Sequence, residues 1–307
     1  MNKSCKTCGN ESIKIYWLLK KSKFELAYCN RCNSFFLTNN IEDGALKDFY
    51  QWFKFNSNKQ KQFLKKIADI LYIYTYWRKS LFIKSVIQKY TTKKELLDFW
   101  WWVWWFSSWL KKVWFNVTMV DYDDESVKVA QNLWIKAHWL WENIWKFPII
   151  FSSHVIEHYT DLNLFFKNID QHIEDKGIFI LSFPNKDCQE FYRKEYVEWY
   201  FWLANFAISL EEFKSNPWFC IDPPRHLYAL SRETILFLTN KFWYTVLDSF
   251  SESSSRENFS CNFIYSIWAV RSIGDIFRNI KYYFSSKKML KANKYSWNSL
   301  VFILQKI

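Results

Sequence analysis

Four of the seven cysteines stand in two Cys-x-x-Cys pairs that are 20 residues apart. Each pair can form a knuckle that offers two thiolates to a tetrahedral ion, and two pairs at this interval are a strong signal for zinc. Gly9 and Asn33 directly follow the pairs and suit the left-handed turn that a knuckle needs. A redox dithiol, the alternative, needs only one pair at the start of a helix. We therefore predict a structural Zn²⁺ bound by Cys5, Cys8, Cys29 and Cys32.

Two carboxylates follow apolar runs that read as strands. Asp98 comes after Leu96 and Leu97, and Asp121 comes after Met119 and Val120. A carboxylate at the tip of the second strand suits the ribose hydroxyls of a nucleotide that lies across the strand ends. Such a ligand also needs a tight turn after the first strand, where glycine adopts positive φ without steric cost. The sequence instead has Trp100, Trp102 and Trp104 there.

Tryptophan thus stands where glycine is required, and the composition agrees. The chain has 4 glycines and 20 tryptophans in 307 residues, whereas glycine usually makes up about 7% of a protein. Trp109, Trp114, Trp134 and Trp243 fall near helix ends, where a left-handed glycine cap is usual. We hypothesise that the source reads the codon UGA as glycine, and that a chain with indoles in the loop is inactive. The alternative is a truly tryptophan-rich chain with an aromatic core or a carbohydrate-binding platform.

Three histidines supply candidates for acid–base chemistry. We favour His226 as the catalytic base because it follows two prolines in a loop. His154 and Glu157 are further catalytic candidates, and Tyr228 stands behind them. His158 is expected to cap the next helix.

Alternating strands and helices from residue 95 onward must position these side chains. The alternation predicts a parallel sheet covered on both faces. The predicted strands are 95–99, 116–121, 135–138, 148–152, 177–183, 243–249 and 298–306. The predicted helices are 104–113, 124–133, 161–173 and 231–241. Short strands at 13–18 and 24–28 would complete a zinc ribbon between the cysteine pairs.

The chain divides into three predicted parts. Residues 1–43 form the zinc ribbon, 44–92 a helical connector and 93–307 the catalytic domain. Within the last part, the aromatic and acidic segment 185–222 is of the sort that covers an active site. Residues 251–297 form a basic insertion between the last two strands.

In this setting the chain resembles the class I S-adenosylmethionine-dependent methyltransferases that carry an N-terminal four-cysteine zinc-ribbon module. The resemblance rests on the loop after Asp98, on the run Ser-Ser-His-Val-Ile-Glu-His at 152–158, on the strand ending at 178–185 and on Pro-Pro-Arg-His-Leu at 223–227. It implies an α/β fold with a Rossmann-like, seven-stranded methyltransferase sheet, preceded by the ribbon and the connector.

The same resemblance implies a cofactor site. Asp98 and the following loop would hold the amino-acid part of S-adenosyl-L-methionine, Asp121 its ribose, and Tyr122 one side of its adenine. Residues 139–144 would close over the adenine, and the end of the fourth strand would lie near the methionine. The implied cofactor-binding residues are Asp98, Phe99, Trp100, Trp102, Trp104, Asp121, Tyr122, Glu142, Asn143, Ser153 and His154.

The formal net charge of +12 indicates an acidic partner, such as a phosphate-bearing substrate, an anionic membrane or a nucleic acid. Residues 271–294 form a basic amphipathic stretch that predicts peripheral membrane contact, although a solvated helix face packed on the core is as good an interpretation. The first residues lack the apolar core of a signal peptide, so we expect a cytoplasmic protein. The resemblance suggests O- or C-methylation of a small-molecule acceptor, such as a quinone, or of a glycan or lipid-linked acceptor.

Two other functions compete with this interpretation. A nucleic-acid-binding or RNA-modifying protein could use the ribbon and the positive charge to grip phosphates. The basic residues are spread through the chain, however, so nucleic acid is not the expected partner. An NAD-dependent oxidoreductase would share the loop and the ribose carboxylate, and binding of one cofactor rather than the other would separate the two.

Overall fold

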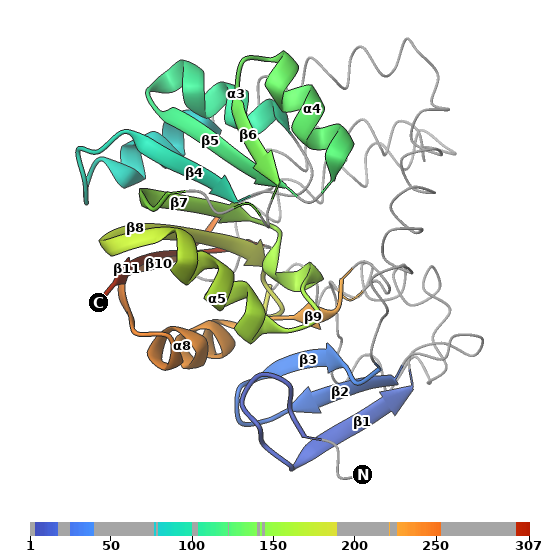
Figure 1. Cartoon of the computed structure of the whole chain (residues 1–307). Helices are drawn as coiled ribbons and strands as arrows, with labels where there is room; N and C mark the ends of the chain where they lie inside the picture. The colour runs from blue at the N-terminus through green and yellow to red at the C-terminus, as the bar shows by residue number, and fades with distance from the viewer. Residues whose placement is uncertain are drawn as a thin grey trace, which may run out of the picture.

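Two sheets organise the computed structural model, which describes residues 4–17, 25–39, 77, 79–99, 104–121, 123–139, 142, 145–188, 221, 226–252 and 299–307. A seven-stranded sheet forms the body, and a four-stranded sheet lies beside it near the N-terminus (Figure 1). All structural statements below concern these residues.

The large sheet has the strand order β10-β11-β8-β7-β4-β5-β6. Neighbours from β8 to β6 run parallel, whereas β11 is antiparallel to both β8 and β10. Its strands are β4 (Glu95–Phe99), β5 (Asn116–Asp121), β6 (Lys136–Trp139), β7 (Phe147–Ser153), β8 (Ile173–Pro184), β10 (Tyr244–Glu252) and β11 (Ser299–Lys306). The predicted Rossmann-like α/β fold with a seven-stranded sheet is therefore confirmed.

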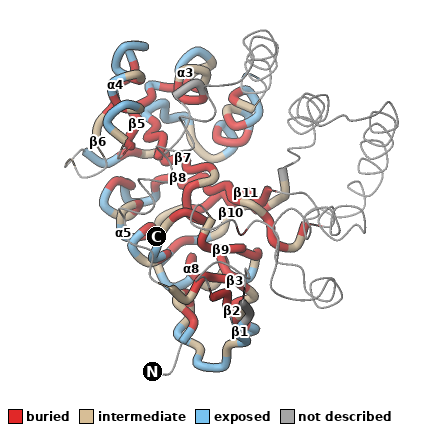
Figure 2. Tube along the Cα trace, turned by 90° about the vertical axis from the view of Figure 1, so that its right-hand side faces the viewer, coloured by how far each residue is buried: buried red, intermediate tan, exposed pale blue. Residues whose placement is uncertain are grey.

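The strands are buried on both faces, which explains their near-continuous apolar sequences. Leu96 and Leu97 are each fully buried but belong to different hydrophobic clusters, because successive side chains of a strand point to opposite faces. Ile178 and Phe179 divide in the same way. Figure 2 shows the buried stretches along β8 and β11 at the centre of the molecule.

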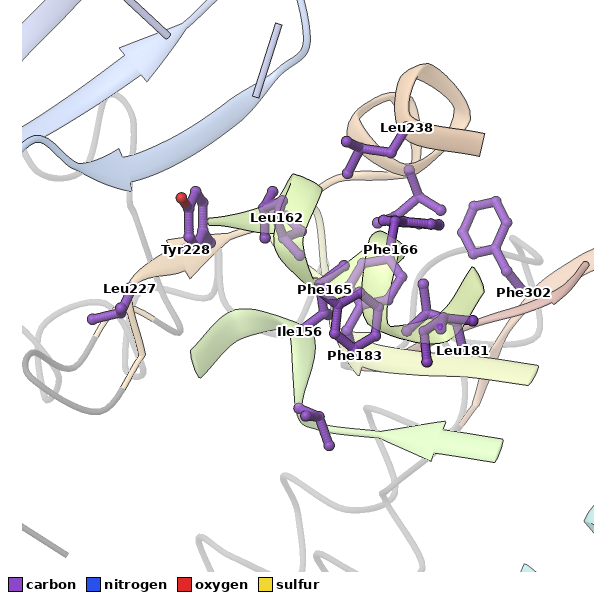
Figure 3. Close-up of a cluster of buried hydrophobic side chains, with 14 of the residues drawn as sticks. Ile156, Leu162, Phe165, Phe166, Leu181, Phe183, Leu227, Tyr228, Leu238 and Phe302 are labelled. Carbon is purple, nitrogen blue, oxygen red and sulfur yellow. The ribbon is translucent and has the colours of Figure 1, made fainter. Parts of the chain in front are cut away.

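Helices cover both faces of the large sheet. On one face, Phe106 and Leu110 of α3 pack with Ile83 of a helix over 79–87. On the other, Phe165 and Phe166 of α5 meet Leu238 of α8 (Figure 3). The helices are α3 (Trp104–Val113), α4 (Asp124–Asn132), α5 (Leu162–His172) and α8 (Arg232–Lys241), and a 3-10 turn, η1, covers Ile156–His158.

The small sheet combines the ribbon with a strand from far along the chain. Its antiparallel order is β1-β2-β3-β9, formed by β1 (Ile13–Trp17), β2 (Glu25–Cys29), β3 (Ser34–Leu37) and β9 (Tyr228–Ala229). The two predicted ribbon strands are found within one residue. The sequence did not predict β3 or β9, and β9 is too short to show any alternation.

Most predicted element boundaries agree with the structure to within two or three residues. The exception is β8, which begins at Ile173 rather than at residue 177. Residues 174–176, near the start of β8, are polar and exposed, so they gave no hydrophobic signal in the sequence.

Several predicted segments lie wholly or partly outside the described ranges. These are most of the connector 44–92, most of the covering segment 185–222 and nearly all of the insertion 251–297 with its basic stretch 271–294. The domain boundaries therefore stay predictions. In the residues that are described, no helix is long and apolar enough to cross a bilayer.

Two tryptophans adopt the left-handed backbone conformation directly after helices. Trp134 follows α4 with a φ of 62°, and Trp243 follows α8 with a φ of 60°. Around Trp134 the hydrogen bonds from Ile135 N to Ala130 O and from Trp134 N to Gln131 O are those of a Schellman motif, whose left-handed residue is usually glycine. Both indoles are exposed, at 87% and 69%.

The other two predicted caps are wrong. Trp109 lies inside α3, where the backbone is helical. Trp114 follows that helix, but its φ is not positive, and its amide hydrogen-bonds to the Leu110 carbonyl. The α3 helix thus ends with ordinary backbone geometry and does not need a left-handed residue.

We predict that Trp134→Gly and Trp243→Gly each raise the free energy of unfolding by about 1 kcal/mol, since the left-handed conformation costs a residue with a Cβ atom roughly that much. Trp109→Gly is the matched control, because glycine inside a helix should lower the free energy of unfolding by about 1 kcal/mol. Urea denaturation measures all three. A loss of stability in both cap variants would show that contacts of the indoles contribute more to the free energy of unfolding than relief of the left-handed backbone does.

Candidate active site

Polar side chains gather where the parallel strands end. Asp98 is near the end of β4, Asp121 ends β5 and Ser153 ends β7. Because β4 is flanked by β5 on one side and by β7 on the other, the order of the strands in the sheet reverses at β4. Ligands of open α/β sheets bind at such a switch point, outside the carboxyl ends of the strands.

Asp98 is fully buried, and only one of its two carboxylate oxygens accepts a hydrogen bond from a described residue. Ser107 of α3 donates a hydrogen bond to its Oδ2 atom, whereas Oδ1 has no hydrogen-bond partner. Burial raises the pKa of Asp98 to about 7, although the bond from Ser107 lowers it. A buried acceptor without a donor is costly, so this atom is suited to a cationic group of a ligand.

Phe99, the next residue, cannot offer its side chain to a ligand. The ring is 2% exposed and packs edge-on against Phe165, with 5.9 Å between ring centroids. Its predicted cofactor contact is therefore restricted to the backbone.

Asp121 is almost completely buried at the tip of β5. Its Oδ1 accepts a hydrogen bond of 2.9 Å from the Asp123 backbone amide. That bond fixes the carboxylate at the strand tip.

Glu142 lies beyond the end of the neighbouring strand β6 and pairs with a histidine. Its Oε2 is 2.8 Å from Nδ1 of His138, and Oε1 accepts a hydrogen bond of 3.3 Å from the Trp139 amide. The contact with His138 lowers the pKa of Glu142. The carboxylate is thus tied to the end of β6, and its contact with the cofactor stays a prediction.

Ser153 and His154 occupy the end of β7. Ser153 is fully buried, and its Oγ lies 3.5 Å from Nζ of Lys79. His154 has a φ of 57°, which turns the chain sharply, and its backbone amide bonds to the Ser182 carbonyl at 2.8 Å. The imidazole Nε2 is 3.3 Å from the Ser299 hydroxyl.

Glu157 lies at the centre of a group of three histidines. Its Oε1 is 3.4 Å from Nδ1 of His154 and 4.0 Å from Nε2 of His158. Burial raises the pKa of Glu157, but His154, His158 and His226 together hold it at about 2. The carboxylate is therefore ionised although it is only 1% exposed.

His226 joins this group from the other end of the domain. Its ring centroid is 4.8 Å from that of His158, and the next amide, of Leu227, bonds to the Glu157 carbonyl at 2.8 Å. The three predicted catalytic residues, His154, Glu157 and His226, are thus brought together.

Two expectations for neighbouring residues are wrong. His158 does not cap α5, because Asp161 accepts the hydrogen bond from the Asn163 amide and takes that position. His158 faces Glu157 and His226 instead. Tyr228, the lesser candidate base, is 2% exposed and donates its hydroxyl to the Thr160 carbonyl at 3.1 Å. Burial raises its pKa, so the hydroxyl is a structural donor.

The four N-terminal cysteines converge as predicted. Their Sγ atoms all lie within 4.8 Å of one another, with 3.6 Å from Cys5 to Cys32 and 3.5 Å from Cys8 to Cys29. A tetrahedral zinc with bonds of about 2.3 Å separates its sulfurs by about 3.8 Å, so the donor set fits this ion. The hydrogen bond between Cys5 and Cys32 lowers the pKa of Cys5 to about 5 and raises that of Cys32, because the two sulfurs share one proton.

The knuckle turns have the expected backbone. Gly9 has a φ of 71° and Asn33 a φ of 53°, both left-handed. Gly9 N donates to the Cys5 carbonyl at 2.8 Å and closes the first turn.

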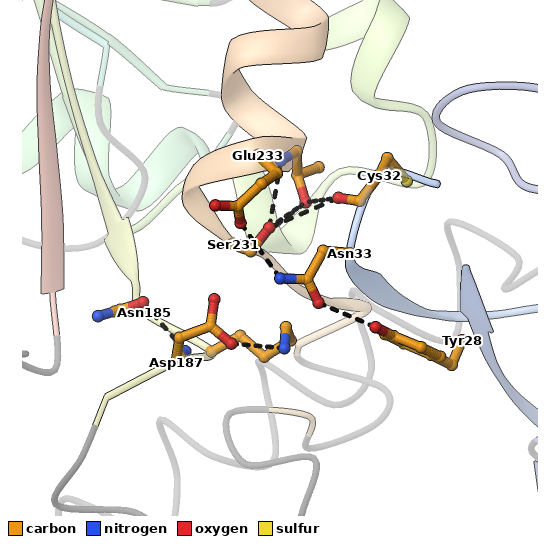
Figure 4. Close-up of polar contacts among 9 residues, drawn as sticks. Tyr28, Cys32, Asn33, Asn185, Asp187, Ser231 and Glu233 are labelled. Atoms are coloured by element: carbon orange, nitrogen blue, oxygen red, sulfur yellow. Dashed lines mark hydrogen bonds and ion pairs between the residues drawn. The ribbon is translucent and has the colours of Figure 1, made fainter. Parts of the chain in front are cut away.

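The second knuckle sits on the N-terminus of α8 (Figure 4). The Cys32 carbonyl accepts a hydrogen bond of 2.7 Å from Thr234 Oγ1, and Asn33 donates one of 3.1 Å to Glu233. Ser231 and Thr234 also form the capping box of this helix. One set of hydroxyls therefore both starts α8 and holds the ribbon.

Some predicted cofactor residues lie outside the part of the chain that the structure describes. These are Trp100, Trp102, Tyr122 and Asn143. Trp104 begins α3, but only its backbone is described.

Three polar residues near the site have positions that the sequence did not predict. Ser107 lies one helical turn into α3, and its position facing Asp98 follows only from the packing of that helix. Lys79 comes from the connector helix. The third residue is His158, which follows Glu157. Its contact with His226 was not predicted because the two histidines are far apart in the sequence.

Residues 92–236 match the family model described as "Methyltransferase domain". No curated protein matches the chain significantly. Residues 92–236 contain β4 to β8 with Asp98, Asp121 and the three catalytic candidates. These residues form a methyltransferase domain, and the predicted enzyme class, methyltransferase, is confirmed.

Many solved structures are similar to this chain at low sequence identity. One is a proposed sarcosine dimethylglycine methyltransferase from Galdieria sulphuraria, 10% identical, with a TM-score of 0.47, covering 75% of this chain and 85% of its own. Another is an S-adenosylmethionine-dependent methyltransferase from Mesorhizobium loti, 10% identical, with a TM-score of 0.43 and coverages of 70% and 91%. A third is coclaurine N-methyltransferase, 11% identical, with a TM-score of 0.46 and coverages of 74% and 72%.

Asp98 should make the stability of the chain fall as pH rises. Its pKa is about 7 in the folded chain and 3.8 ordinarily, so the folded chain holds this proton more tightly than the unfolded chain. The stabilisation is complete below the ordinary value and is lost as the pH rises through about 7. We expect the free energy of unfolding of Asp98→Asn to decline less between about pH 5 and about pH 8 than that of the parent.

Denaturant titrations at several pH values measure this difference. Asp175→Asn is the matched control, because its carboxylate is exposed at the start of β8 and should leave the parent's pH profile unchanged. Identical profiles for the parent and Asp98→Asn would mean that Asp98 ionises normally.

Proposed function

We propose that this chain transfers a methyl group from S-adenosyl-L-methionine to a small-molecule, glycan or lipid-linked acceptor, at oxygen or carbon. The observation that carries the proposal is the unpartnered, fully buried Oδ1 of Asp98 at the switch point of the sheet. The methyltransferase domain supplies the reaction class.

The residues around this atom suit the parts of the donor. Asp98 would accept the ammonium group of the methionine moiety, which would also favour its ionised form. Asp121, on the next strand, would accept hydrogen bonds from the ribose hydroxyls. Ser153 and the adjoining backbone at the end of β7 would lie beside the methionine chain.

When bound, S-adenosylmethionine supplies an electrophilic methyl group on sulfur. The chain has to align the acceptor with that methyl group, exclude water and take up any proton that the acceptor loses. The cluster of His154, Glu157 and His226 lies at the end of β7, next to the proposed donor site, so we assign proton uptake to it. Ionised Glu157 would stabilise a neighbouring imidazolium.

We propose further that the cofactor loop carries glycine at 100, 102 and 104 in the active protein. The left-handed, exposed Trp134 and Trp243 support this reading, since both occupy positions that glycine usually takes. A loop that wraps a ligand with its backbone has no room for three indoles.

The ribbon would hold one Zn²⁺ through Cys5, Cys8, Cys29 and Cys32. Its function here is structural, because four thiolates leave no open position for a substrate. The ion would fix the knuckle that bonds to α8 and so the segment that carries His226.

Cofactor binding tests the proposal directly. We expect the chain with Trp100→Gly, Trp102→Gly and Trp104→Gly to bind S-adenosylmethionine in isothermal titration calorimetry, and the printed chain not to bind it. In the glycine chain, Asp121→Asn should weaken binding by about 10- to 100-fold, since hydrogen bonds to a charged group contribute about 1.5–3 kcal/mol.

The controls separate the alternatives. Asp175→Asn in the glycine chain should bind like its parent. Binding of NAD in place of S-adenosylmethionine would identify an oxidoreductase and contradict the proposal. Equal binding by the printed chain would refute the assignment of glycine to the loop.

A further inference from the structure

A second group of metal-ligating side chains lies apart from the cysteines. Glu157, His158 and His226 each present a ligand atom, and these atoms lie within 4.8 Å of one another. We propose that the three side chains bind a divalent transition-metal ion. This site would be chemically distinct from the four-thiolate ribbon.

The donor set selects the kind of ion. Two imidazoles and one carboxylate suit Zn²⁺ and the neighbouring first-row divalent ions, such as Fe²⁺, Co²⁺ or Ni²⁺. Three protein ligands also leave at least one coordination position open. Sites of this type take part in reactions, whereas closed four-thiolate sites are structural.

The burial of Glu157 indicates that its carboxylate binds a cation. It is 1% exposed, and among the described residues its only close contact is the ion pair between Oε1 and His154, because neither carboxylate oxygen meets hydrogen-bond geometry. The nearest imidazole nitrogens, of His154 and His158, are 3.4 Å and 4.0 Å away, beyond a normal hydrogen-bond length of about 2.7–3.2 Å. A buried carboxylate is tolerated when it is paired or coordinates a metal, and an ion bound beside Glu157 would be a closer partner for its oxygens than these imidazoles are.

The spacing suits an ion after small adjustments. Ligands about 2.0–2.2 Å from a tetrahedral ion lie about 3.4 Å from each other. The 4.0 Å between the Glu157 and His158 ligand atoms therefore has to shorten by a few tenths of an ångström. Rotation about side-chain bonds suffices for this.

The backbone already holds the three residues together. The Leu227 amide bonds to the Glu157 carbonyl at 2.8 Å, and the His158 amide bonds to the Val155 carbonyl at 3.0 Å. Tyr228 pairs with Phe36 of the ribbon two residues after His226. Ligands that come from rigid, hydrogen-bonded elements are preorganised, which favours metal binding.

The role of the ion rests on the proposed function. His226 is only partly buried, so the open coordination position can receive an acceptor hydroxyl. Coordination would lower the pKa of that hydroxyl, and its proton would pass to His154. The oxygen lone pair would then form the bond to the methyl carbon, while the electron pair of the broken carbon–sulfur bond stays on sulfur.

The metal content of the unaltered chain, with tryptophan at 100, 102 and 104, tests the site without any need for cofactor binding. After saturation with Zn²⁺ and removal of excess ion, elemental analysis should give two ions per chain. Glu157→Gln and His158→Ala should each retain one. The matched control, His138→Ala, removes a histidine that also pairs with a glutamate, and it should retain two.

Cobalt replacement gives a second readout that requires no variant. The unaltered chain loaded with Co²⁺ should show thiolate-to-metal charge-transfer bands from the ribbon and a separate set of weak visible bands from a nitrogen and oxygen site. A stoichiometry of one, with sulfur-type bands alone, would overturn the proposal, as would two ions in both ligand variants. Two ions together with failed S-adenosylmethionine binding would leave this site standing and remove the proposed function.

Discussion

The pairing of β3 with β9 is the constraint on which the site depends. Two residues of the methyltransferase body, Tyr228 and Ala229, extend the ribbon sheet, and the preceding residues hydrogen-bond to the turn that carries Glu157. The ribbon thereby fixes the backbone on which His226 stands. Since β9 has only two residues, it gains its order from its neighbours and not from its own sequence. The small module therefore helps to hold the segment that carries His226.

The site itself is built around two buried carboxylates that the protein does not satisfy. Asp98 has one oxygen without a donor, and Glu157 has two. The environments push them in opposite directions, because burial alone raises the pKa of Asp98, whereas three imidazoles lower that of Glu157. Asp98 is thus the carboxylate that a cationic ligand group would favour in its ionised form, whereas the histidines already favour the ionised form of Glu157. Such unsatisfied groups cost stability and are found where a ligand restores the balance.

The sequence was sufficient for the parts of the fold that have strong local signals. Mainly apolar runs such as 95–99 and 116–121 located the parallel strands, and the cysteine spacing located the two cysteine knuckles. The sequence was insufficient where tertiary packing decides the conformation or the neighbours of a residue. The two-residue strand β9 has no periodicity, and the place of His158 depends on a loop nearly 70 residues later. Trp109 was wrongly predicted to be a helix cap because its neighbours in sequence do not show where α3 ends.

The contact between the ribbon and α8 also has a consequence for the order of folding. The ribbon strands pair with near neighbours in sequence, but Ser231 meets the Cys32 carbonyl across a separation of 199 residues. Local pairings form early, whereas a contact of this separation has to wait for loop closure. During synthesis the ribbon emerges long before its partner strand exists. Until then the edge of β3 is an unpaired strand, and a bound chaperone or a second ribbon could take the place that Tyr228 and Ala229 later fill.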